Sequence, residues 1–103
     1  MTYLDDVSAD IRNAVPNDAL PDEDTTGLFL TYAVLLLAKG EEVTREDVHN
    51  AWVAWMSSKG HGGESHESMV PFSELPPETQ AEDSPFVVAI RTVAQDRRNA
   101  GPT

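Results

Sequence analysis

The sequence contains no cysteine, few basic residues and no long hydrophobic run. A chain without cysteine forms no disulfide, offers no thiol nucleophile and builds no cysteine-ligated zinc site. The longest apolar stretch, residues 28–38, is shorter than a bilayer span, and the first residues lack the basic start and apolar run of a secretory signal. We therefore expect a soluble cytoplasmic protein that does not associate with membranes.

Basic side chains are scarce, because seven lysines and arginines stand against eighteen aspartates and glutamates, giving a formal net charge of −11. Such a surface repels the phosphate backbone of nucleic acid and anionic lipid. We therefore expect no nucleic-acid partner, whereas a partner protein with a basic surface is compatible with this charge.

The 103 residues are 40% hydrophobic, which suffices for a single domain, 1–103, with one modest core. Apolar residues recur at helical spacing in four segments, so the sequence predicts a mainly α fold, a small bundle of about four helices. The expected helices cover residues 2–15, 26–40, 44–60 and 84–98, with 99–103 as a tail. An extended, proline-containing linker precedes the last helix and leaves room for a short β pairing.

The third expected helix has the clearest boundaries. Thr44 is its predicted N-cap and Gly60 its predicted end. Helical spacing predicts a core stripe on one face of it, formed by Val48, Ala51, Trp52 and Trp55. His49 and Met56 are expected on the flank of this stripe. The second helix is apolar on nearly every face and is therefore expected at the centre of the bundle.

The loop "GHGGESHESMVPFSELP" at residues 60–76 raises the question of chemistry. Its His61, Glu64, His66 and Glu67 could converge on a transition metal, but their spacing matches no zinc signature. "GESHE" resembles a nucleophile elbow, yet Glu67 is too bulky for that turn and no strand precedes it. We therefore expect no metal, no cofactor and no catalytic residue, and hence a protein that is not an enzyme.

A family resemblance rests on three stretches, "VHNAW", the following "KG", and "SHESMVPFSELPPETQAED" before a closing apolar helix. They resemble the ryanodine-receptor repeat (RyR domain) over roughly residues 20–94, with the helix at 2–15 as an added element. His49 and Trp52 match the first part of the family's pattern. The second part is matched by His66, Val70, Pro71, Glu74, Leu75 and Asp83.

The resemblance implies a small bacterial or phage form of a non-enzymatic binding module, with a nucleotide-like small molecule as ligand. The expected cleft lies between the helix of His49 and Trp52 and the loop around His66. A flat ligand would stack on Trp52, and Lys59 or Arg91 would meet its phosphate. The candidate ligand-binding residues are His49, Trp52, Met56, Lys59, His66, Glu74 and Arg91.

The linker itself has a structural role in this reading. Pro71 keeps Val70 out of helical geometry, so residues 69–75 can lie across helix ends as a buried strap. His66 and Glu74, at the two ends of the strap, are then expected to be half-buried and to need polar partners.

Two other functions stay open at this point. One is an acidic protein–protein interaction factor, a phage or accessory protein whose acidic face engages a basic host protein. The other is a metal-dependent enzyme that uses His61, Glu64 and His66. The oligomeric state is also open, because the apolar second helix could face a partner subunit.

Overall fold

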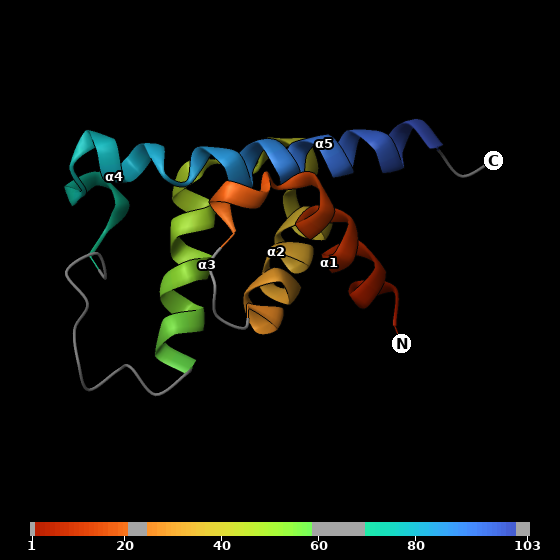
Figure 1. Cartoon of the computed structure of the whole chain (residues 1–103), viewed down its shortest axis with the longest axis horizontal. Coiled ribbons are helices and arrows are strands. Elements are labelled where there is room, and N and C mark those ends of the chain that lie inside the picture. Colours follow the sequence, from red (N-terminus) through yellow and green to blue (C-terminus); the bar gives the residue numbers. More distant parts are fainter. Residues whose placement is uncertain (1, 21–24, 59–69, 101–103) are drawn as a thin grey trace.

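The computed structural model describes residues 2–20, 25–58 and 70–100. In these ranges the chain forms α1 (Tyr3–Ala14), α2 (Thr26–Lys39), α3 (Arg45–Ser58), the short α4 (Pro77–Ala81) and α5 (Ser84–Ala100). Three 3-10 turns lie between them, at Asn17–Ala19, Gly40–Glu42 and Phe72–Glu74. The predicted fold of four main helices with a proline-containing linker is confirmed (Figure 1). The described residues contain no strand, so the short β pairing is absent from this part of the chain.

Side chains close to the backbone fix where the helices begin and end. The Thr2 N–H donates to the Asp5 carboxylate at 2.9 Å, which caps α1. Thr44 and Asp47 exchange the same kind of bonds at the start of α3, at 2.9 and 3.2 Å. The helix α2 ends at Gly40, whose φ of 58° lies in a region that glycine adopts at little cost. The cap predicted for Thr44 is therefore confirmed.

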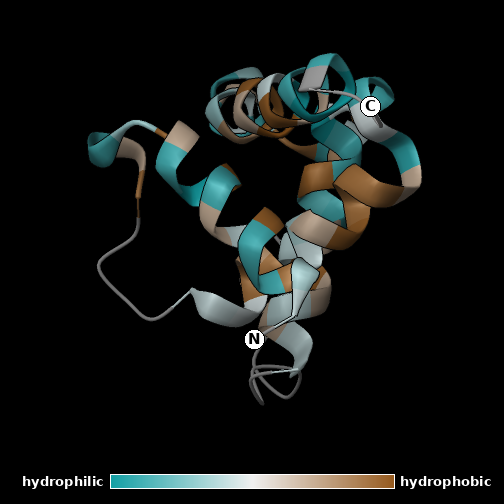
Figure 2. Cartoon of the chain, turned by 90° about the vertical axis from the view of Figure 1, so that its right-hand side faces the viewer, coloured by the Kyte–Doolittle hydropathy of each residue, from teal (hydrophilic) through white to brown (hydrophobic). Residues whose placement is uncertain are grey.

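The core forms around α2, which packs against α1, α3 and α5. The buried residues of α2 are Leu28, Phe29, Tyr32, Ala33 and Leu36. Phe29 and Tyr32 meet edge to face at 5.3 Å, and Phe86 at the start of α5 joins both rings. In Figure 2 hydrophobic residues gather where the helices face one another. The predicted central position of this helix is confirmed.

Two neighbours on α3 exchange their expected places. The sequence put Trp52 in the core and His49 on the flank, but His49 is buried with 3% of its surface exposed and Trp52 is only half-buried. The reason is that the turn at Phe72–Glu74 packs against the His49 side of α3, which helical periodicity cannot reveal. The core face of α3 is therefore formed by Val48, His49, Ala51 and Trp55.

The linker before α4 only partly follows the buried strap that was expected. Pro71, with φ −53° and ψ 143°, lies outside helical geometry, but residues 72–74 form a 3-10 turn, and of the residues from Val70 to Leu75 only Leu75 is buried. Glu74 is exposed, so the expectation that it is half-buried is wrong, because the turn directs its side chain to solvent.

None of the helices in residues 2–20, 25–58 and 70–100 combines the length and the hydrophobicity that a membrane crossing requires.

Candidate functional site

His49 lies at the contact between α3 and the linker. Its Nε2 is 2.6 Å from the carbonyl oxygen of Val70. A carbonyl oxygen can only accept, so Nε2 carries a proton and donates it. The ring also stacks on Trp52, with the ring centres 5.9 Å apart, and lies 6.0 Å from Phe72. His49 therefore holds the linker against α3 from within the protein.

Two further contacts fix the linker at this place. The Gln80 amide of α4 donates to the carbonyl oxygens of Phe72 and Leu75, at 3.0 and 3.1 Å. The Arg45 guanidinium lies 5.8 Å from the centre of the Phe72 ring, a distance at which a cation is attracted to the ring face. The polar partners that the linker needs thus come from His49 and Gln80, and not from Glu74.

Asp83 is a half-buried carboxyl where α4 ends and α5 begins, and its backbone carbonyl accepts the Val87 N–H of the first turn of α5. Burial raises its pKa to about 6, and the neighbouring Glu82 adds to the rise, whereas His49 and Arg45 oppose it. Burial also raises the pKa of Tyr32, and the Asp83 charge adds to that rise. The pKa of Asp83 is thus raised toward neutral pH from the ordinary value of an aspartate.

The predicted ligand-binding residues do not converge in the described part of the chain. His49 and Trp52 meet, and Met56 is half-buried one turn further along α3. Glu74 is exposed. Arg91 donates from Nε to the carbonyl oxygen of Val43 at 2.7 Å, which ties α5 to the segment that joins α2 and α3.

The remaining predictions of site residues cannot be placed. Lys59 and His66 lie outside the described residues, as do His61, Glu64 and Glu67 of the metal hypothesis. Within the described ranges, no group of three or more histidine, aspartate or glutamate residues is arranged to hold a metal ion.

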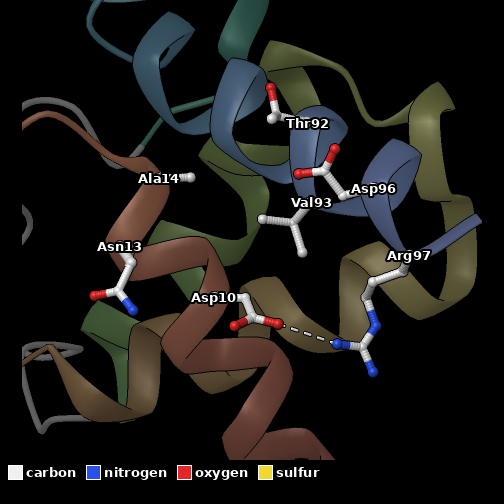
Figure 3. A pocket seen from close by; sticks show the side chains of 7 residues that line it. All are labelled: Asp10, Asn13, Ala14, Thr92, Val93, Asp96 and Arg97. Atoms are coloured by element: carbon white, nitrogen blue, oxygen red, sulfur yellow. Dashed lines mark hydrogen bonds and ion pairs between the residues drawn. The ribbon is translucent and has the colours of Figure 1, made fainter. Parts of the chain in front are cut away.

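A groove that the sequence did not indicate lies between α1 and α5. Its volume is about 500 Å³, within the range of known small-ligand sites. The α1 side is formed by Asp10, Asn13 and Ala14 (Figure 3). The α5 side is formed by Thr92, Val93, Asp96 and Arg97.

The groove has an apolar floor and a polar rim. Val93 is buried and stands at the centre, surrounded by the polar side chains (Figure 3). Arg97 of α5 donates to the Asp10 carboxylate of α1 at 3.1 Å. The side chains of Asn13, Thr92 and Asp96 form no hydrogen bond or ion pair with any described residue and are exposed. Their hydrogen-bonding groups are therefore free to meet a ligand.

The only signal for this groove in the sequence is the spacing of polar residues beside the apolar stripes of α1 and α5. That signal is shared by every amphipathic surface helix. Which sides of α1 and α5 meet is decided by how both pack on α2, and this is not readable from either segment alone.

Comparison with known families assigns the chain to a family without a known role. The model of the Domain of unknown function (DUF7701) matches residues 2–95, so the chain belongs to this family. No curated protein matches the chain, and no solved structure does.

The expected membership of the RyR domain family is wrong, because the matching family model is a different one and no RyR model matches. Most of the residues that carried the resemblance lie in residues 66–83, and many of them are prolines, apolar residues and acids. In the described part of that stretch, Pro71, Pro76 and Pro77 stand at the starts of a 3-10 turn and a one-turn helix. Such residues specify local geometry in many unrelated folds.

Proposed function

We propose that this protein is a non-enzymatic interaction module that binds a basic partner protein through its acidic surface, in the cytoplasm. The observation that carries the proposal is the surplus of carboxylates without an ion pair. In the described part of the chain, ion pairs use Asp10, Glu41 and Asp47. The acids there without an ion pair are Asp5, Asp6, Asp18, Glu42, Glu46, Glu74, Glu78, Glu82, Asp83 and Asp96.

The basic side chains of the described residues cannot neutralise this surplus, because most are already engaged. Lys39, Arg97 and Arg98 form ion pairs. Arg91 is bonded to a backbone carbonyl and Arg45 lies over an aromatic ring. An excess of one charge sign of this kind steers an oppositely charged protein into contact and disfavours like-charged partners.

Exposed apolar residues support the same proposal. Val34 and Leu37 lie three residues apart on α2 and are about half exposed, at 53% and 50%. Val88 on α5 and Tyr3 on α1 are exposed as well. Apolar side chains that a partner covers would add contact energy that charge alone does not supply.

The nucleotide-like ligand expected from the sequence has no further support. It rested on the RyR resemblance, and one face of the Trp52 ring carries His49.

The proposal is tested by capture and then kinetics. The purified protein is immobilised, a partner is captured from an extract of the source cell and identified, and its association rate is measured at about 0.05 and 0.5 M salt, where screening differs strongly. We expect the association rate constant to fall about tenfold or more, with a smaller change in dissociation.

A variant pair sharpens this test. Glu46→Gln with Glu78→Gln removes two charges that have no ion pair and is expected to slow association. Glu46→Asp with Glu78→Asp keeps both charges and is the matched control. Association that is indifferent to salt and equal in the two variants would show that acidic charge does not direct the binding.

A further inference from the structure

The floor of the groove between α1 and α5 suits an aliphatic stem. Val93 and Ala14 present methyl groups to the groove, and Val93 is only 6% exposed. The methylene chain of a lysine or arginine lies readily on such a surface while its charged end stays in a polar environment. The floor therefore selects a ligand with an extended apolar portion.

The rim offers acceptors for a charged donor group. Thr92 and Asp96 are separated by one helical turn on α5, so they lie on the same side of that helix. Asn13 stands across the groove on α1, with its amide turned away from them (Figure 3). The Asp96 carboxylate and the Thr92 hydroxyl accept hydrogen bonds, and a guanidinium or ammonium group donates several at once.

The charges of the groove determine the sign of the ligand. Asp10 and Asp96 are acidic and Arg97 is basic, and Arg97 is held by Asp10. The Asp96 charge is left without an internal partner. The Asp96 charge would repel a phosphate or a carboxylate, whereas one positively charged group would neutralise it.

We propose that the groove between α1 and α5 receives one cationic side chain, an arginine or lysine, from a basic segment of the partner protein. This inference rests on the proposed function and names the place of contact. The aliphatic stem lies on Val93 and Ala14, and the cationic end bonds to Asp96, with Thr92 as a further acceptor. The groove volume of about 500 Å³ leaves room for the residues that flank the side chain.

A small probe tests the site without the partner. N-acetyl-arginine amide is titrated into the ¹⁵N-labelled protein, and N-acetyl-citrulline amide serves as the uncharged isostere. We expect the arginine derivative to shift backbone amide signals at Asn13, Thr92, Val93 and Asp96, and the citrulline derivative to leave them in place. Equal shifts with both probes, or shifts centred on the acids of α3 and α4, would overturn the proposal.

Matched variants separate a specific site from diffuse attraction. Asp96→Asn is expected to weaken arginine binding about tenfold, the usual size of a lost charge-assisted hydrogen bond. Asp6→Asn removes the same charge from an exposed residue of α1 that does not line the groove, so it is expected to change binding by less than about twofold. Both side chains are exposed, and thermal melts confirm that both variants fold. An equal loss in the two variants contradicts the proposal.

Failure of this inference can be told apart from failure of the proposed function. Salt-dependent partner binding that is unaffected by Asp96→Asn places the interface elsewhere and rejects the groove. Binding of the arginine probe without any salt-dependent protein partner supports a cationic site and rejects the proposed function.

Discussion

The two ends of α5 have different surroundings, since one is packed against other helices and the other borders an open groove. At its beginning, Phe86 packs on aromatic rings of α2 and the neighbouring Asp83 is half-buried beside His49. Near its end, Thr92 and Asp96 face an open groove with no partner among the described residues. We call the first of these the closed end of α5 and the second the open end. Histidine and tryptophan, the residue types that suggest chemistry, lie at the closed end. Ordinary surface residues line the open end.

The difference indicates which residues of a small helical domain stabilise the fold and which are available to bind a partner. A buried histidine that donates to a backbone carbonyl is already satisfied and contributes to folding. Exposed polar residues around an apolar floor have hydrogen-bonding groups that are available to a ligand. We therefore expect substitutions at the closed end to change stability, and substitutions at the open end to change binding.

His49→Ala should have the largest effect on stability. It removes a fully buried ring and its hydrogen bond to Val70, so the free energy of unfolding should fall by about 3 kcal/mol. Urea unfolding followed by tryptophan fluorescence measures the change. His49→Gln, which keeps a donor, should recover part of the loss. A change below about 0.5 kcal/mol, the size typical of exposed sites, would mean that this end is not held by His49.

Gln80→Ala should rank second. Its amide donates to the carbonyl oxygens of Phe72 and Leu75, so its removal should cost about 1–2 kcal/mol and loosen the linker. Urea unfolding gives the energy, and hydrogen exchange at the Leu75 amide reports the linker directly. Gln95→Ala on an exposed turn of α5 is the control. Equal changes in the free energy of unfolding for the two substitutions would show that the Gln80 hydrogen bonds do not stabilise the linker.

The pH dependence of stability should reveal the protonation of the Asp83 carboxyl. Its folded-state pKa of about 6 lies above its ordinary value of 3.8, so the folded protein binds the proton more tightly than the unfolded chain. The stabilising contribution is therefore complete below about 3.8 and is lost as the pH rises through about 6. The Asp83 carboxyl is only half-buried, so solvent screening limits this contribution to about 1 kcal/mol.

Thermal melts between these pH values compare the wild type with Asp83→Asn. The difference between the two proteins isolates Asp83 from the other groups near it, which are His49, Arg45, Glu82 and Tyr32. We expect the melting temperature of Asp83→Asn to change less with pH than that of the wild type. Parallel curves would show that Asp83 does not titrate in this range.

The fold was largely predictable from the sequence, because local chemistry determines it. The caps at Thr2 and Thr44, the glycine end at Gly40 and the apolar α2 all act within one or two turns. What could not be predicted depends on contacts between distant segments. His49 is buried because Val70 and Phe72, more than twenty residues away, cover it.

The site was predicted less well for the same reason. Arg91 was expected at a ligand phosphate, but it is bonded to Val43, 48 residues earlier. The groove combines residues of α1 and α5 that are separated by about eighty positions, and none of them is unusual in its own helix. Single-helix patterns therefore identify which residues are exposed, and they do not identify which exposed residues meet.

Arg97→Ala should have the smallest effect on stability and is informative for that reason. Its ion pair with Asp10 at 3.1 Å joins two exposed side chains, and such pairs contribute about 0.5 kcal/mol or less. Removing Arg97 leaves Asp10 without its ion pair, so the groove gains a second unpaired carboxylate. The arginine probe should then bind more tightly, by about threefold or more, and its binding should depend more steeply on salt. Arg12→Ala removes an exposed arginine of α1 that does not line the groove and controls for net charge. If both variants bind the probe equally well, the Asp10–Arg97 pair does not compete with the ligand, and the open end of α5 differs from the closed end only in exposure.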